Sequence, residues 1–320
     1  MDVGVIGVGI MGSNHARVYS ELKDVDSVWV YDLDESQAKR VAEKNGAQCT
    51  ASMEKLLRNV DAVSLCVPTP YHYTCAKQVI DAGVHMLIEK PICLTYHEAE
   101  SLINFIPDDL VVGVGHIERF NPIIKEITNI IKNPLYVEIK RHNPSSARVT
   151  GSSVVEDLMI HDIDLVFHAL FKDEYTMMSS GSYDICSALF QFGPTPVYLS
   201  ASRKSSKKIR RIYIEEEEFT VQGDFMTQEI YVFRKPENYS QDAERYVQEN
   251  IIEKVMVGKV EPLKTELNTF LQCITAGKPF TVTPEQAAMN VKISESITGG
   301  FIPCSRHFRS SLKSVARSET

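Results

Sequence analysis

A glycine-rich turn directly after the first apolar run places the strongest constraint on how this chain folds. Residues 3–8 read VGVIGV, and Gly7, Gly9 and Gly12 form the pattern G-x-G-x-x-G at the start of a helical stretch. Gly7 allows a tight turn, Gly9 lets a phosphate approach the backbone, and Gly12 allows the helix to pack closely on the strand. Because a helix amino end presents free N–H groups, this turn is typical of a βαβ unit that binds a nucleotide.

A carboxylate at the end of the second apolar run supports this interpretation. Asp32 ends the run SVWVYD (27–32) and follows Gly12 by about 20 residues, where a carboxylate binds ribose hydroxyls. Leu33 and Asp34 come next, with no arginine to accept a 2′-phosphate. We therefore expect NAD rather than NADP. The alternative, a glycine turn beside a surface aspartate, does not explain the order of strand, turn, helix and acidic strand end.

Short apolar runs separated by helical patterns fill the first part of the chain. They lack alternation of apolar and polar residues, which predicts strands buried on both faces and hence parallel, with helical crossovers. The runs cover residues 3–8, 27–32, 62–67, 84–89 and 110–115. The sequence therefore predicts an α/β fold whose first domain, residues 1–117, is a doubly wound Rossmann sheet that binds NAD.

The pattern changes after about residue 118, where we place a second domain over residues 118–305. The expected elements are a helix over 118–132, a strand over 135–143, a helical stretch over 154–170, several strands between 183 and 235, and helices over 261–276 and 284–298. Short turns between the strand-like runs indicate an antiparallel meander. We predict an α+β substrate and oligomerisation domain with a large, open, mostly antiparallel sheet, followed by a weakly ordered tail over 306–320.

Composition limits the classes of partner. A net charge of -8 and a pI of about 5.7 argue against nucleic acid, because phosphate-backbone binding needs a basic surface. No run approaches the roughly 18 apolar residues of a membrane span. The seven cysteines form no CxxC pair, which favours reduced thiols over zinc or disulfides. The chain begins in a strand pattern, so we expect no signal peptide and a cytoplasmic protein.

An acid and a base stand together at the end of another apolar run. The stretch HMLIEKP, residues 85–91, ends in Glu89, Lys90 and Pro91. Ionic side chains are rarely buried without a partner or a role. Ligands of doubly wound sheets lie beyond the carboxyl ends of the strands, so we expect Lys90 beside a bound ligand. The alternative is a surface lysine that caps a helix.

Together these motifs resemble the glucose–fructose oxidoreductase/inositol dehydrogenase (Gfo/Idh/MocA) family of NAD(P)-dependent oxidoreductases, over nearly the whole chain. DAVSLCVPTPYHYTCAKQVIDAGVHMLIEKP (61–91) is similar to the family's fourth and fifth strands, and EDLMIHDIDL (156–165) is similar to its substrate-side helix. GHIERFNP (115–122) and RHNPSSARVTGSSVVED (141–157) resemble, more narrowly, the branch that oxidises UDP-N-acetylglucosamine at C3.

The resemblance implies an enzyme that transfers hydride from a CH–OH group of a sugar or nucleotide-sugar to NAD. It also implies an unusual Lys90–Pro91 bond, a candidate for the cis form, that directs Lys90 into the site. One face of the second sheet would make subunit contacts, so we expect a homo-oligomer, a dimer or tetramer. The expected cofactor contacts are Gly7, Gly9, Ile10, Met11, Gly12, Asp32, Thr69, Pro70, His72, Glu89 and Lys90.

The expected helix over 154–170 supplies the other half of the chemistry. Asp157, His161, Asp164 and His168 fall on one helical face, which is not expected to be all core because it holds two acids. A histidine between carboxylates can exchange protons, so His161 is assigned as general acid/base with Lys90, and Asp157 as the residue that orients it or binds the sugar. His168 is interpreted as a packing residue. A metal site at this spacing lacks a third strong ligand, and we expect none.

Two arginines are candidates for binding a diphosphate, since guanidinium groups bind phosphate through paired N–H donors. Arg119 begins a helical stretch near the expected site, and Arg148 lies in a loop rich in Ser and Pro. The alternative for each is a solvated side chain. The expected substrate contacts are Lys90, Arg119, Asn121, Arg148, Asp157 and His161.

Two other functions stay open at this point. The chain could oxidise a free polyol or monosaccharide such as inositol, which carries no diphosphate. It could also be a non-catalytic regulator that senses NAD or a sugar on the same scaffold. Such a regulator could lose Lys90 or His161, and the presence of both favours an enzyme.

Overall fold

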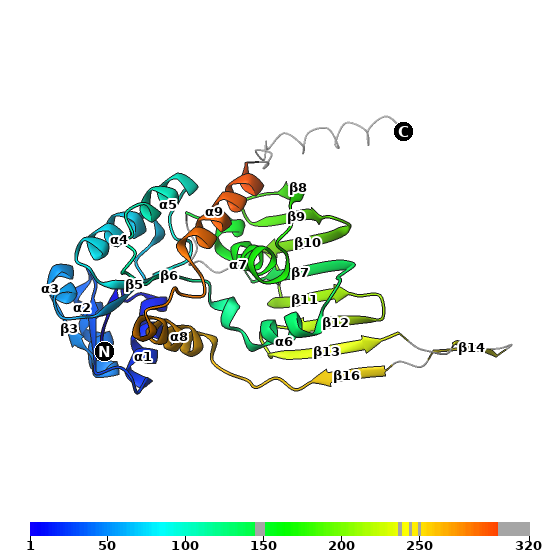
Figure 1. Ribbon diagram of the computed structural model, residues 1–320, viewed down its shortest axis with the longest axis horizontal. Coiled ribbons are helices and arrows are strands. Elements are labelled where there is room, and N and C mark those ends of the chain that lie inside the picture. The colour runs from blue at the N-terminus through cyan, green and yellow to red at the C-terminus, as the bar shows by residue number, and fades with distance from the viewer. Residues whose placement is uncertain (145–150, 236–238, 243–244, 249–250, 300–320) are drawn as a thin grey trace, which may run out of the picture.

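Two sheets lie side by side, with α7 (Ile160–Leu165) and α9 (Pro284–Thr298) between them (Figure 1). The computed structural model describes residues 1–144, 151–235, 239–242, 245–248 and 251–299. A six-stranded parallel sheet forms the amino-terminal half, and an eight-stranded, mostly antiparallel sheet forms the other half. The predicted fold class, a Rossmann sheet followed by an α+β region, is confirmed.

The first sheet has the strand order β3-β2-β1-β4-β5-β6. Its strands are β1 (Asp2–Ile6), β2 (Ser27–Tyr31), β3 (Gln48–Cys49), β4 (Ala62–Leu65), β5 (His85–Glu89) and β6 (Val112–Gly115). Its helices are α1 (Ile10–Glu21), α2 (Glu35–Asn45), α3 (Met53–Leu57), α4 (His72–Asp81) and α5 (Tyr96–Ile103). Because β1 pairs in parallel with both β2 and β4, the strand order reverses there, which is where such sheets bind ligands.

The second sheet has the order β16-β13-β12-β11-β7-β10-β9-β8. Its strands are β7 (Tyr136–His142), β8 (Tyr175–Gly181), β9 (Ile185–Phe192), β10 (Thr195–Ser202), β11 (Ile209–Glu215), β12 (Phe219–Asp224), β13 (Glu229–Arg234) and β16 (Ile251–Val255). The hairpin of β14 (Tyr239–Asp242) and β15 (Arg245–Gln248) forms a separate small sheet. Residues of β7 and β9 alternate between buried and more exposed, so one face, the inner face, packs on helices and the outer face does not.

Five strands are absent from the sequence prediction: β3, β8, β16 and the two strands of the hairpin, β14 and β15. β3 has only the polar pair Gln48–Cys49, and the edge strands β8 and β16 hold no buried residue. A strand held mainly by backbone hydrogen bonds along a neighbour leaves little apolar pattern to find.

The helix predicted over 118–132 is divided in the structure. Ile117–Phe120 forms a 3-10 turn, and α6 (Pro122–Ile130) starts afresh. Pro122 has no N–H to continue a helix and disfavours helical geometry in the residue before it, so Asn121 becomes the amino-terminal cap.

Two apolar cores correspond to the two sheets, and the last helices connect them. α8 (Pro262–Ala276) packs Leu263, Leu267 and Phe270 into the core of the first sheet, while α9 contributes to both cores. The boundary at residue 117 therefore stays a proposal about the division of the chain, because α8 returns to the amino-terminal side. The tail predicted over 306–320 lies outside the described residues.

Within the described ranges, no helix is both long enough and apolar enough to cross a membrane.

Candidate active site

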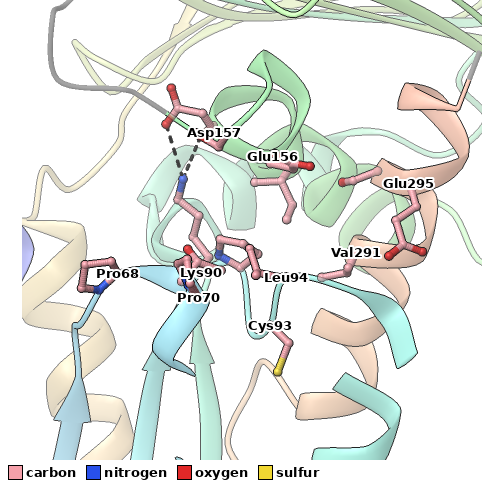
Figure 2. A pocket seen from close by; sticks show the side chains of 15 residues that line it. Pro68, Pro70, Lys90, Cys93, Leu94, Glu156, Asp157, Val291 and Glu295 are labelled. Carbon is pink, nitrogen blue, oxygen red and sulfur yellow. Dashed lines mark hydrogen bonds and ion pairs between the residues drawn. The ribbon is translucent and has the colours of Figure 1, made fainter. Parts of the chain in front are cut away.

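The carboxyl ends of β4 and β5 face the helical stretch that contains α7 across a cavity of about 380 Å³ (Figure 2). α9 closes another side of this cavity. The charged residues that line it are Lys90, Glu156, Asp157 and Glu295. The structure therefore brings the two motifs predicted to carry the chemistry to one place, although about 65 residues of sequence separate them.

Lys90 projects from the end of β5 toward Asp157 (Figure 2). The Lys90–Pro91 peptide bond is cis, as the resemblance implied. Nζ of Lys90 donates a hydrogen bond to the backbone oxygen of Asp157 at 2.7 Å and lies 3.8 Å from its Oδ1. Burial lowers the pKa of Lys90, although the carboxylates of Asp157 and Glu89 oppose the shift. The neutral amine, which can accept a proton, is thus reached at lower pH than in an exposed lysine.

Glu89 forms a buried link with His15, a partner that sequence reasoning did not identify. Its Oε2 accepts the backbone N–H of Lys90 at 3.2 Å, and its Oε1 lies 3.0 Å from Nε2 of His15. Nδ1 of His15 lies 2.9 Å from Oγ of Ser64. A fully buried histidine one turn after the glycine motif was the available signal. The contacts of Glu89 are internal, which suits a residue that positions Lys90, and its contact with the cofactor stays a prediction.

The glycine turn fits a dinucleotide. Gly7 has φ of +84°, a left-handed conformation that favours glycine, and a Cβ on Gly12 would lie only 1.9 Å from the Gly7 oxygen. A Cβ on Gly9 would meet no atom within 4 Å, so open space lies above the backbone there. Ile10 is 62% exposed and Met11 37% exposed at the first turn of α1, which leaves this helix end accessible.

Asp32 lies beside the same turn. Its Oδ2 accepts the backbone N–H of Val8 at 2.7 Å, and its Oδ1 accepts that of Asp34 at 2.9 Å. The carboxylate therefore sits at the edge of the open space above Gly9, as ribose recognition requires. These residues would hold the nucleotide of NAD, with the pyrophosphate at the amino end of α1.

The three cofactor contacts predicted after β4 do not all face the cavity. Thr69 and Pro70 line the cavity, and their contact with the cofactor stays a prediction. His72 is only 1% exposed, and its two ring nitrogens lie 2.8 Å from the carbonyl oxygens of Val67 and Pro91. The prediction of a cofactor contact for His72 is therefore wrong, because both of its polar atoms bind the loops after β4 and β5 to each other.

His161 lies near Lys90 but is not held by carboxylates. Its Nδ1 has no hydrogen-bond partner among the described residues, and its ring centroid lies 6.4 Å from that of His116. The carboxylate of Asp157 faces Lys90 and, at 3.8 Å, Arg203 instead. We therefore correct the prediction that Asp157 orients His161. Burial, followed by the charge of Lys90, brings the pKa of His161 well below its usual value, so the ring is neutral near pH 7.

Asp164, predicted on the same helical face as Asp157 and His161, is buried in an ion pair with Arg119. Arg119 donates to it from Nε at 2.6 Å and from a terminal nitrogen at 3.1 Å, and donates also to Gln286 at 3.2 Å. The Arg119 side chain is only 8% exposed. Nε and one terminal nitrogen of Arg119 thus bind internal partners, which disfavours the predicted diphosphate contact, and that contact stays a prediction. His168 contacts Gln286 and Asn290, as expected of a packing residue.

Asn121 is likewise structural. It is 3% exposed, donates to the backbone oxygen of Phe225 at 3.0 Å, and accepts the N–H of Ile123 as the cap of α6. This corrects its assignment as a substrate contact. Arg148 lies outside the described residues.

Sequence reasoning also missed a buried charge network on the inner face of the second sheet. Arg141 of β7 is 1% exposed and donates to Asp162 at 2.7 and 2.9 Å and to Glu118 at 2.7 Å. Asp162 was overlooked because its helical position falls off the face that holds Asp157 and His161. Over the described chain, no three His, Cys, Asp or Glu residues gather as metal ligands.

Comparisons with known proteins agree with the Rossmann fold and with NAD as the cofactor. A model of the oxidoreductase family with an NAD-binding Rossmann fold matches residues 1–124. The chain is 31% identical over 288 residues to the UDP-N-acetylglucosamine 3-dehydrogenase of Acidithiobacillus ferrooxidans, covering 87% of this chain and 90% of that one. A solved structure of that enzyme matches with a TM-score of 0.83 over 93% of this chain and 96% of the other, at 29% identity.

Other similar proteins act on other sugars and polyols. An inositol 2-dehydrogenase/D-chiro-inositol 3-dehydrogenase of Shouchella clausii is 30% identical, over 54% of each chain. The structure of levoglucosan dehydrogenase with NADH and levoglucosan shares the fold, with a TM-score of 0.78 over 93% of this chain and 96% of the other, at 17% identity. Since one similarity at 31% identity spans most of both chains, this protein belongs to the Gfo/Idh/MocA family of NAD-binding oxidoreductases.

Proposed function

We propose that this protein oxidises C3 of UDP-N-acetylglucosamine, or of a close UDP-sugar, to the 3-keto sugar with NAD as the hydride acceptor. The observation that carries the proposal is Lys90, a partly buried amine of lowered pKa that projects from the end of β5 toward Asp157 in the cavity. The similarity to a UDP-N-acetylglucosamine 3-dehydrogenase over 87% of this chain supports this substrate.

In this proposal, different residues transfer the proton and position the groups that transfer it. When NAD is bound, it supplies the acceptor for the hydride. Nζ of Lys90 accepts the proton of the sugar hydroxyl, and the neutral ring of His161 is a second acceptor or donor nearby. Asp157 holds the Lys90 amine through its backbone oxygen, and Glu89 fixes the backbone of Lys90. Each of these groups is present before substrate binds, which reduces the reorganisation that the reaction needs.

The test is incubation of the purified protein with NAD and separate sugars, with reduced nicotinamide followed by absorbance and the keto product trapped. UDP-N-acetylglucosamine should be oxidised and free N-acetylglucosamine should not. Lys90→Ala and His161→Ala should each lower kcat by about 10²–10⁴-fold, the range of general acid–base catalysis. NAD binding, measured by fluorescence, serves as the folding control. Oxidation that persists at the wild-type rate in Lys90→Ala would refute the assigned role.

A free polyol is the second candidate substrate, and the charge of the cavity favours it. Three carboxylates, of Glu156, Asp157 and Glu295, line the cavity, and Lys90 is its only cation among the described residues. Carboxylates accept hydrogen bonds from hydroxyl groups and repel phosphates. Oxidation of inositol in the same assay, with no reaction of the UDP-sugar, would establish this alternative. Tight NAD binding without turnover of any sugar would instead favour the regulator.

A further inference from the structure

A cationic cluster, Arg141, Lys208 and Arg210, lies where β7 and β11 meet, on the side of the sheet that faces α7. Arg141 and Arg210 are cross-strand partners, so two guanidinium groups stand side by side. Both approach Oε1 of Glu118, Arg141 at 2.7 Å and Arg210 at 3.4 Å. Lys208 precedes Arg210 by two residues at the exposed start of the strand.

The two arginines differ in how well their charges are compensated. Arg141 binds Asp162 and Glu118 with three hydrogen bonds. Arg210 has only the longer contact with Glu118, and its buried Nε has no partner within the described part of the chain. Its side chain is 30% exposed, so it can be reached from solution. Adjacent like charges raise each other's energy, and an anion bound at Arg210 would relieve that cost.

Arg210 also lies within electrostatic reach of the catalytic pair. Burial is the main cause of the lowered pKa of both Lys90 and His161, and the charge of Arg210 adds to it; for Lys208 the charge of Arg210 is the largest cause. No hydrogen bond joins Arg210 to Lys90 or His161 in the described chain. An anion at Arg210 would lie opposite Arg141, whose partner Asp162 follows His161 in the chain, without touching the residues that move the proton.

We propose that Arg210, assisted by Lys208, binds the diphosphate of the nucleotide-sugar substrate. The inference rests on the proposed function, because only a nucleotide-sugar carries this group next to the sugar ring. A guanidinium matches phosphate oxygens with paired N–H donors, and an exposed lysine adds a second positive charge. The cavity lined by Glu156, Asp157 and Glu295 is unfavourable for phosphates, whereas the β11 side presents the incompletely paired Arg210.

The experiment uses UDP itself as the probe, titrated calorimetrically into the NAD-loaded protein. Arg210→Gln should weaken UDP binding by about 10–100-fold, the value of losing charged hydrogen bonds. Arg211→Gln is the matched control, because the next side chain points to the outer face and pairs with Asp224. NAD affinity should be the same in all three proteins. With UDP-N-acetylglucosamine as substrate, Arg210→Gln should raise KM by a larger factor than it changes kcat.

Several outcomes would overturn the inference. They are absence of UDP binding to the wild-type protein, equal UDP affinity in wild type and Arg210→Gln, or equal losses in Arg210→Gln and Arg211→Gln. Turnover separates this inference from the proposed function. Oxidation of UDP-N-acetylglucosamine with an unchanged KM in Arg210→Gln refutes the diphosphate site alone. UDP binding that depends on Arg210, in a protein that oxidises only free polyols, refutes the proposed function and retains an anion site.

Discussion

The six-stranded sheet supplies its chemistry from loops at its strand ends, whereas the eight-stranded sheet supplies charge from within one face. β4 and β6 are buried along their whole length, and β5 carries its ionic pair only where it ends, at Glu89 and Lys90. β7 instead buries Arg141 inside the strand. A parallel strand covered by helices on both faces leaves no room for a charge along its length, while a strand facing one helix can hold a charge if that helix supplies the counterion.

Removing the buried charge of the second sheet is the most severe test of this comparison. Arg141→Leu leaves the carboxylates of Asp162 and Glu118 without their main partner, so the free energy of unfolding should fall by about 3–5 kcal/mol. Lys140→Leu is the control, since Lys140 is 40% exposed on the outer face and its pair with Glu138 should contribute less than about 1 kcal/mol. Urea unfolding with equal midpoints for the two variants would contradict the comparison.

Acid should destabilise the strand ends of the first sheet. Burial lowers the pKa of His116, at the end of β6, from 6.5 to about 4, against the opposing charge of Asp164. Between these two values the unfolded chain binds a proton that the folded chain does not, so stability falls as pH drops from about 6.5 to about 4. The full loss from this one group is on the order of 3 kcal/mol. Urea unfolding of wild type and His116→Gln across this range should show a shallower pH dependence in the variant, and parallel curves would disprove the role of His116.

A substitution in the glycine turn should have a smaller effect, lowering the affinity for NAD without changing the stability of the fold. A Cβ at Gly9 meets no protein atom within 4 Å, so Gly9→Ala should leave stability unchanged. NAD affinity should fall about tenfold, because the methyl group occupies the space through which the pyrophosphate approaches. Gly258→Ala also meets no atom and lies far along the chain, which makes it the control. Unchanged NAD titration of Gly9→Ala would place the pyrophosphate elsewhere.

A substitution on the outer face of the second sheet should have the smallest effect on the stability of a single chain, and should change its assembly instead. Met178 and Leu189 are paired residues of β8 and β9 and are 67% and 38% exposed. We propose that this face joins copies of the chain, because neighbouring exposed apolar side chains mark contact surfaces. Light scattering after gel filtration should give a dimer or tetramer for wild type and a smaller particle for Met178→Glu. A monomeric wild-type protein would disprove the homo-oligomer.

The sequence alone determined those features that short stretches encode. Gly7, Gly9 and Gly12 predict the nucleotide turn, and apolar runs without alternation predict a parallel sheet, because both signals depend on neighbours close in the chain. Lys90 could be placed at the ligand edge for the same reason, since the carboxyl end of a buried strand is visible from its apolar run.

Only the tertiary structure decided which charges pair and which stay available. The sequence does not distinguish Arg119 from Arg210. In the structure, Arg119 donates to the buried Asp164, whereas Arg210 lies beside another arginine. Asp157, the carboxylate expected beside His161, pairs instead with Lys90, which lies at the end of a strand distant in the sequence. These partners are separated by tens of residues, so no local pattern records them. The sequence gives the charge of a side chain, but the packing of elements that are far apart in the chain determines its counterion.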